Sequence, residues 1–155
     1  MAIDNNIKTL NNIVWYFKNH HPRFDWMYSV ERIEICYLAD WKHVLDNDYQ
    51  ITNTEWRSGY IMYAKENPFL KPLFQPESAE FTGSELKTLN HVIKSTKDKS
   101  PPLQTRLVKS TWPLIRGPVL DLRALARSYN KYLEENGMEG YYVRQQGIPD
   151  ETTPG

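Results

Sequence analysis

Apolar residues recur at helical spacing in several stretches of this chain of 155 residues. Residues three and four apart lie on one face of a helix, so such spacing predicts an amphipathic helix with one buried side. The first prediction covers residues 3–19, where the apolar positions are Ile7, Leu10, Val14 and Phe17. Pro22 disfavours helical geometry in the residue before it, and the helix is expected to end there.

The second predicted helix is apolar around much of its circumference. Ser29 is expected to cap its start and Glu31 to favour its first turn. The apolar positions that follow are Val30, Ile33, Cys36, Tyr37, Leu38, Trp41, Val44 and Leu45. A helix that is apolar on most sides is buried, so this one should lie at the centre of the fold, and the polar residues 46–48 should end it.

The character of the chain changes between residues 50 and 63, where β-branched and aromatic residues are frequent. This composition predicts a β-hairpin or an extended arm. The dipeptides Asn67-Pro68 and Lys71-Pro72 disfavour a long regular element over residues 64–80. This stretch is expected to be a loop with one helical turn at most.

Three further helices are predicted in the second half. Thr82 and Glu85 have the spacing of a capping box, and Phe81 and Leu86 occupy the positions of a hydrophobic staple. A short helix is expected to start at Ser100-Pro101 and to stop at Pro113. A last helix is predicted over residues 119–136, with Gly137 as its C-terminal stop.

These elements predict a mainly α fold, a compact bundle of about five helices with a small β-hairpin or extended arm between the second and third. Residues 1–137 are expected to form one helical domain. Residues 138–155 are expected to be a flexible C-terminal extension, because their sequence turns polar and ends near a proline.

Charge is balanced over the whole chain but not along it. Lysine plus arginine equals aspartate plus glutamate at 19 each, which argues against a protein dedicated to coating DNA. Between Lys87 and Lys131, however, basic residues outnumber the two acidic ones, Asp98 and Asp121. The span is interpreted either as solvated helix faces or as a basic face for an acidic partner or nucleic acid.

Cysteine usage and hydropathy bear on the compartment. Cys36 is the single cysteine, which excludes an internal disulfide and a cysteine-rich metal site. No apolar run approaches the roughly 18 residues of a membrane span, and the first eight residues do not resemble a signal peptide. A cytoplasmic protein with no membrane partner is expected.

The sequence lacks the common catalytic and cofactor-binding motifs. It has no P-loop, dinucleotide-binding glycine pattern, HExxH, CxxC or G-x-S-x-G. Asp40 and His43 stand three apart on one helix and could orient a general base, but an ordinary surface pair is the commoner reading. We therefore expect no enzyme, no cofactor and no metal site, including any site built from His20, His43 and His91.

Several stretches, in order, resemble the Panacea domain of SocA-like antitoxins. The stretches are 36–42 (CYLADWK), 50–52 (QIT) with Glu55-Trp56, 91–96 (HVIKST) and 107–113 (LVKSTWP), followed by a final helix rich in Leu, Ala and Tyr. Together they span residues 7–135. One difference is clear: family members usually carry a Gly-Pro turn after the arm's tryptophan, and here no proline occurs between Trp56 and Pro68.

The resemblance implies an antitoxin that neutralises a partner toxin by direct binding, or that delivers it to a protease as an adaptor. Residues of the arm are the candidates for the partner-binding site, since Trp, Tyr and Arg dominate binding hot spots. They are Trp56, Arg57, Tyr60 and Tyr63. Packing of these aromatic residues on the domain's own core is the competing interpretation.

Two other functions stay open at this stage. A phage or mobile-element protein could use the same scaffold against host defence, with the atypical arm as a changed interface. A DNA-binding regulator could use the basic span, where a short helix is followed by a longer one.

Overall fold

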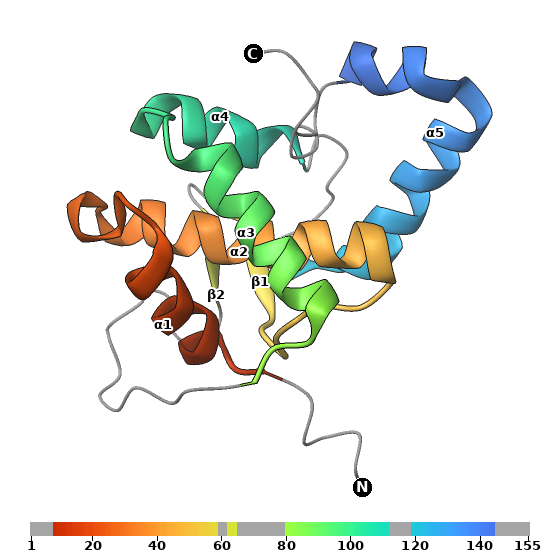
Figure 1. The fold of residues 1–155 in the computed structure, drawn as a ribbon. Coiled ribbons are helices and arrows are strands. Elements are labelled where there is room, and N and C mark those ends of the chain that lie inside the picture. Colours follow the sequence, from red (N-terminus) through yellow and green to blue (C-terminus); the bar gives the residue numbers. More distant parts are fainter. Residues whose placement is uncertain (1–7, 59–61, 65–79, 112–118, 145–155) are drawn as a thin grey trace, which may run out of the picture.

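The computed structural model describes residues 8–58, 62–64, 80–111 and 119–144. Within them the chain forms five α-helices, a 3-10 helix and three short strands (Figure 1). In chain order these are α1 (Leu10–His20), η2 (Phe24–Trp26), α2 (Ser29–Asn47), β1 (Trp56–Ser58), β2 (Met62–Ala64), α3 (Gly83–Thr96), α4 (Pro101–Ser110), β3 (Val119–Leu120) and α5 (Leu122–Arg144). The predicted mainly α fold is confirmed.

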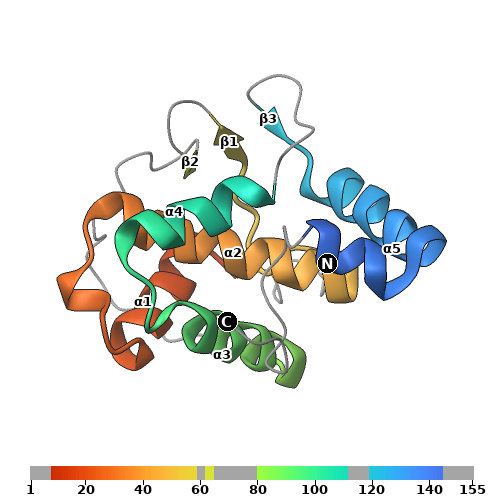
Figure 2. The ribbon, with the colours of Figure 1, turned by 90° about the horizontal axis from the view of Figure 1, so that it is seen from above.

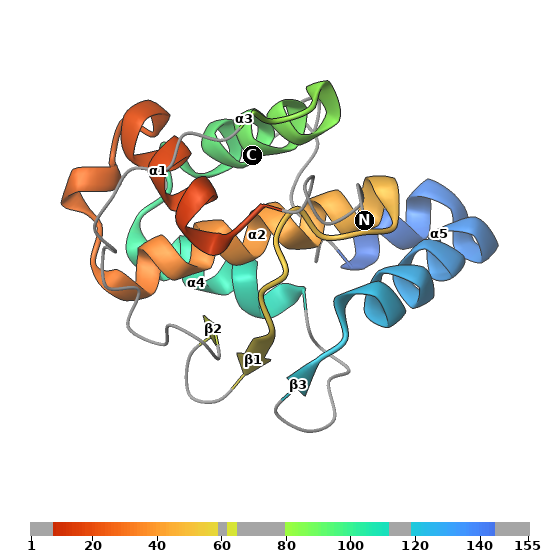
Figure 3. The same ribbon diagram turned by 90° about the horizontal axis from the view of Figure 1, so that it is seen from below.

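Helix α2 is the centre of the fold, as its apolar circumference predicts. It contacts α1, α3, α4, α5 and β2. In Figures 2 and 3 it lies between α3 on one side and the small sheet on the other, with α5 near its C-terminal end. Between residues 33 and 44 only Lys42 is not buried. A helix surrounded in this way has no solvent face for most of its length, so its polar residues need partners inside the protein.

The β element between α2 and α3 is a sheet of order β2-β1-β3, and both pairings are antiparallel. Strand β1 pairs with β2 in the register Arg57↔Tyr63, which confirms the predicted hairpin. On its other side β1 pairs with β3, where Trp56 faces Leu120. The predicted start of the last helix at Val119 is therefore wrong. Sheet pairing, which depends on residues far away in the sequence, takes Val119–Leu120 into a strand.

Helix α5 instead begins at Leu122, after Asp121 accepts a hydrogen bond from the backbone N–H of Ala124 (3.0 Å). The predicted stop at Gly137 is also wrong, because α5 continues to Arg144. Glycine in a helix interior costs only about 1 kcal/mol relative to alanine, which neighbouring turns can offset. The division into residues 1–137 and 138–155 thus falls inside a helix and stays a prediction, and residues 145–155 lie outside the described part.

The other helix boundaries follow local capping. Helix α1 begins at Leu10, later than predicted, because Thr9 and Asn12 exchange hydrogen bonds between side chain and backbone. Helix α2 is capped at Tyr28, not at Ser29, where the Glu31 carboxylate accepts the Tyr28 N–H (3.1 Å). The capping box of α3 and the start of α4 at Pro101 are confirmed.

Candidate partner-binding surface

Trp56, a predicted partner-binding residue, is a core residue. Its side chain is 0% exposed. The indole N–H donates to Asp40 Oδ2 (2.8 Å), and the ring meets Tyr37 edge to face at 5.6 Å between centroids. A side chain with no exposed surface cannot touch a partner, so this prediction is wrong. The competing interpretation, that the tryptophan packs on its own core, is confirmed.

Asp40 holds the whole arm against α2. Besides the indole, it accepts hydrogen bonds from the Thr52 backbone N–H (3.0 Å), the Thr52 hydroxyl (2.6 Å) and the Gln50 amide (3.2 Å). Complete burial raises the pKa of Asp40 to about 6, and the hydrogen bonds from Thr52 and Trp56 oppose that rise. Four donors converge on this one buried carboxyl group and fix residues 50–56 against α2.

The other predicted partner residues of the arm give no compact surface. Arg57 is partly exposed and forms an ion pair with Glu55 (2.8 Å). Tyr60 lies outside the described residues. The backbone of Tyr63 pairs with that of Arg57 in the sheet, but its side chain is outside the described part. Arg57 is thus the one predicted site residue placed with an accessible side chain.

Two exposed aromatic residues stand at the opposite end of α2. Trp26 is 83% exposed and Tyr28 is 78% exposed. The other large apolar residues that are exposed in the described part, Tyr49, Leu103 and Val119, are at most 50% exposed. A tryptophan and a tyrosine two residues apart, both open to solvent, are the residue types that dominate protein-binding hot spots.

The backbone beneath these two aromatic residues is held in place. Phe24 and Met27 alternate with them and are buried at 4% and 5% exposure. The Trp26 N–H donates to the Arg23 carbonyl (3.0 Å), which closes the turn of η2. Arg32, one turn into α2, stacks its guanidinium on the Phe24 ring at 4.5 Å. Trp26 and Tyr28 therefore project from a fixed base.

A buried histidine joins this segment to α3. The Thr96 hydroxyl donates to the Val92 carbonyl (2.7 Å), so His21 Nε2–H donates to that hydroxyl (2.9 Å). His21 Nδ1 accepts the Arg23 backbone N–H (3.1 Å), which requires a neutral ring. Burial, with the nearby Arg23 charge, lowers the pKa of His21 to about 4.

A buried glutamine joins the start of α2 to α4. Gln104 is 0% exposed, and its amide donates to the Glu31 carbonyl (3.0 Å) and to the Glu34 carboxylate (3.0 Å). Glu34 also accepts the Thr105 hydroxyl (2.9 Å). Burial raises the pKa of Glu34, and these two hydrogen bonds oppose the rise. The base of the aromatic pair is thus tied to two other helices by buried polar contacts.

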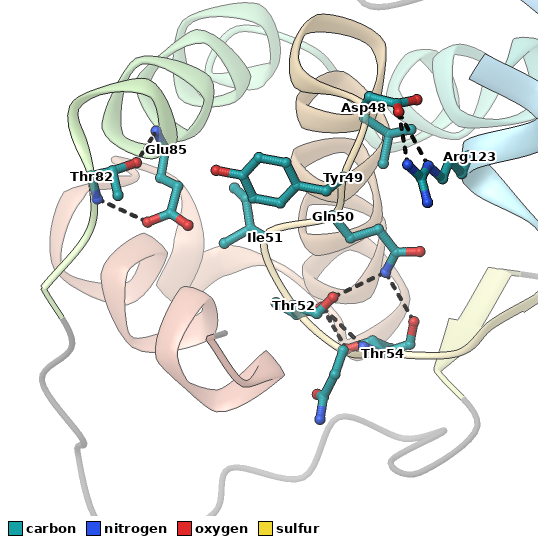
Figure 4. A pocket seen from close by; sticks show the side chains of 11 residues that line it. Asp48, Tyr49, Gln50, Ile51, Thr52, Thr54, Thr82, Glu85 and Arg123 are labelled. Atoms are coloured by element: carbon teal, nitrogen blue, oxygen red, sulfur yellow. Dashed lines mark hydrogen bonds and ion pairs between the residues drawn. The ribbon is translucent and has the colours of Figure 1, made fainter. Parts of the chain in front are cut away.

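A hollow of about 740 Å³ lies on the other side of the molecule, between residues 48–54, the start of α3 and the start of α5 (Figure 4). Figure 4 shows Tyr49 extending across it toward Glu85. The charged groups on its lining are already paired: Glu85 with Lys8 at 3.5 Å, and Asp48 with Arg123 at 3.0 Å. The hollow therefore offers shape and an apolar floor but no unpaired charge.

The groups considered for catalysis are separated by the fold. Asp40 bonds the arm, whereas His43 Nδ1 contacts the Thr88 hydroxyl at 3.0 Å. Burial, followed by the charge of Asp40, raises the pKa of the Cys36 thiol well above its usual value. Among the described residues no cluster of three or more His, Cys, Asp or Glu side chains could hold a metal ion.

Comparison of the chain with protein-family models, with curated proteins and with solved structures found no match. In the described part of the chain, no helix has both the length and the apolar character needed to cross a bilayer.

Hydrophobic periodicity did not identify Trp26 and Tyr28 as exposed residues. Both lie in the short stretch between Pro22 and α2, outside the apolar pattern of either flanking helix. Aromatic residues that no helix accounts for are candidates for exposure. The sequence alone did not separate them from the buried Phe24 and Met27.

Proposed function

We propose that this chain is a protein-binding domain of the antitoxin type, which neutralises a partner toxin by direct contact through Trp26 and Tyr28. The observation that carries the proposal is the exposure of these two side chains on a rigid base. Water-exposed aromatic surface is unfavourable for the free protein, and its burial by a partner is favourable.

The rigidity of the base adds to the argument. Ordering a mobile segment on binding costs free energy, and a segment already ordered avoids that cost. The turn of η2, the Arg32–Phe24 stack and the His21–Thr96 contact all order it before any partner arrives. Blocking the toxin and delivering it to a protease would both use such a contact.

The resemblance to Panacea domains supports the choice of a toxin as the partner. Three residues from its motifs, Asp40, Thr52 and Trp56, form one buried network. A network of this kind serves the scaffold, so the motifs describe how the domain is built. The surface that selects the toxin is then expected elsewhere on the domain, as the position of Trp26 and Tyr28 suggests.

Co-expression with the product of the neighbouring gene tests the proposal. The chain should form a complex with that product and restore growth where the product alone is toxic. The double substitution Trp26→Ala with Tyr28→Ala should weaken the complex at least about 30-fold, because a hot-spot residue contributes about 2 kcal/mol or more. Tyr49→Ala, a half-exposed aromatic residue beside the hollow, is the matched control and should leave affinity unchanged.

Two results would count against the proposal in different ways. Absence of both a complex and growth rescue would remove the antitoxin function. A complex that tolerates the double substitution but is weakened by Tyr49→Ala would move the partner surface to the hollow.

A further inference from the structure

Four cationic residues lie on the segments that carry the exposed aromatic pair or adjoin them. Arg23 and Arg32 belong to the same segment as Trp26 and Tyr28. Arg23 also donates to the Thr96 carbonyl (2.9 Å), which brings the end of α3 and the residues that follow it alongside. Lys97 and Lys99 come directly after Thr96, and the Lys99 backbone N–H bonds the same carbonyl (3.1 Å).

Figures 1 and 2 show the backbone segments that carry these residues at one end of the molecule, where the end of α1, η2, the start of α2 and the α3–α4 connection meet. We name it the aromatic–basic end and define it by Trp26, Tyr28, Arg23, Arg32, Lys97 and Lys99. Its members come from segments about 70 residues apart in the sequence, so only the tertiary fold assembles it.

These four cations have no ion pair among the described residues. Arg23 contacts the Thr96 carbonyl and the Gln104 amide oxygen (3.4 Å). Arg32 contacts the Phe24 ring and carbonyl. Of the nearby acids, Asp25 pairs with Lys18 at 3.3 Å, Glu31 is buried where it accepts the Tyr28 N–H (3.1 Å), and Asp98 stands between the two lysines. On the accessible surface of this end, the four cations are therefore opposed by one unpaired acid in the described part of the chain, Asp98.

The opposite end of α2 shows how this protein neutralises its own cations. There Asp48 binds both Arg123 (3.0 Å) and Arg127 (2.8 Å). Hydrogen bonds from these two guanidinium groups lower the pKa of Asp48 below its usual value. No acidic side chain plays that part at the aromatic–basic end within the described residues.

We propose, resting on the proposed function, that the aromatic–basic end binds an acidic segment of the partner protein. Apolar side chains of that segment pack on Trp26 and Tyr28, and its carboxylates face Arg23, Arg32, Lys97 and Lys99. Complementary charge around an aromatic centre is the usual anatomy of a specific interface.

The same cations could attract nucleic acid, but the arrangement favours a protein. Binding to DNA requires many phosphate contacts to give useful affinity. Here the cations are few, and the guanidinium of Arg23 already bonds Thr96 and Gln104. The most exposed groups between them are two aromatic rings that present apolar surface.

Binding of synthetic peptides to the full chain, followed by fluorescence anisotropy, tests the inference. The probe is a short peptide in which Glu alternates with Leu and Trp, and the comparison peptides replace Glu by Gln or by Lys. The acidic peptide should bind more tightly than either, and salt should weaken it. Lys97→Glu with Lys99→Glu should lower its affinity about tenfold or more, since like charges then face each other.

Lys87→Glu with Lys131→Glu is the matched control. It changes net charge equally on two exposed lysines of α3 and α5, and it should leave the affinity within about twofold. Thermal unfolding of both double variants should stay close to that of the unchanged chain, because Lys87, Lys97 and Lys131 are exposed, Lys99 is half-buried, and none of the four belongs to the core.

Each alternative result has a distinct meaning. Equal affinity for the Glu and Lys peptides, or equal losses in both double variants, overturns the acidic-segment inference. Preference for duplex DNA over the acidic peptide, lost in Lys97→Glu with Lys99→Glu, overturns it in favour of nucleic acid. A toxin complex that needs Trp26 but ignores Lys97 and Lys99 leaves the proposed function standing while this inference falls. Binding of the acidic peptide without any toxin complex does the opposite.

Discussion

Two tryptophans, one before and one after the central helix in the chain, have opposite environments. Trp56 in the arm is 0% exposed, whereas Trp26 before α2 is 83% exposed. Both sit on backbone fixed by buried polar groups of the protein, Asp40 for the arm and His21 for the η2 segment. The difference is that Asp40 offers an acceptor inside the core for the Trp56 indole, while nothing in the described structure covers Trp26.

Trp56 stabilises the fold, whereas Trp26 is available to a partner. The arm looked like the better interface in the sequence because it combines Trp, Arg and Tyr. In the fold its tryptophan stabilises the junction between α2 and the sheet, and the aromatic surface available to a partner is elsewhere. Residue type alone does not distinguish the two uses.

The largest expected effect is on Trp56. Trp56→Ala should lower the free energy of unfolding by about 3–5 kcal/mol, since it leaves a large cavity in the core. Trp26→Ala should change it by no more than about 0.5 kcal/mol, as for an exposed position. Chemical denaturation measures both. A loss below about 1 kcal/mol for Trp56→Ala would contradict its place in the core.

The next largest effect on stability is expected at Asp40, which accepts the hydrogen bonds that hold the arm. Asp40→Ala should destabilise by about 2–3 kcal/mol, because the buried N–H groups of Trp56 and Thr52 lose their acceptor. The loss should be local as well. Proteolysis of the native protein is expected to cut within residues 48–58 sooner than before, while the η2 segment stays protected. Equal protection of both regions in the variant would show that Asp40 does not hold the arm.

Acidification should change stability in opposite directions through His21 and Asp40. The folded pKa of His21 is lowered to about 4, so between about pH 6.5 and 4 the unfolded state binds more protons, and stability falls as the pH falls. The folded pKa of Asp40 is raised to about 6, so between about pH 6 and 4 the folded state binds more protons and stability rises as pH falls. Each contribution amounts to about 3 kcal/mol.

Single variants measure these contributions. On acidification from about pH 7 to about pH 4.5, the His21→Gln variant should lose less stability than the unchanged chain, and the Asp40→Asn variant should lose more. Denaturation at several pH values gives the slopes. Parallel slopes for both variants would exclude the opposed roles of the two groups.

The smallest expected effect is on the exposed part of the arm. Arg57→Ala should change stability by less than about 0.5 kcal/mol, because its pair with Glu55 is accessible to solvent and screened by salt. It should also leave partner affinity unchanged if contact occurs through Trp26 and Tyr28. A tenfold loss of affinity in this variant would return the interface to the arm.

Much of the secondary structure could be predicted, because its causes are local. The Thr82–Glu85 capping box, Pro101 at the start of α4 and the apolar circumference of α2 all act over a few neighbouring residues. The errors lie where distant contacts or weak signals decide. Val119 pairs with Arg57 across the sheet, and Gly137 alone is too weak to end a helix.

The sequence by itself determined a central apolar helix, the helices around it and a short β element after it, since spacing and capping are properties of adjacent residues. Which aromatic residues are buried depends on contacts between distant segments. Trp56 is covered because Asp40, sixteen positions away, accepts its N–H inside the core. Trp26 is exposed because the contacts of its neighbours with Thr96 and Gln104 hold the backbone but leave the indole outside. Burial depends on which segments meet in space, and the pattern of residues along the chain does not show which distant segments lie close together.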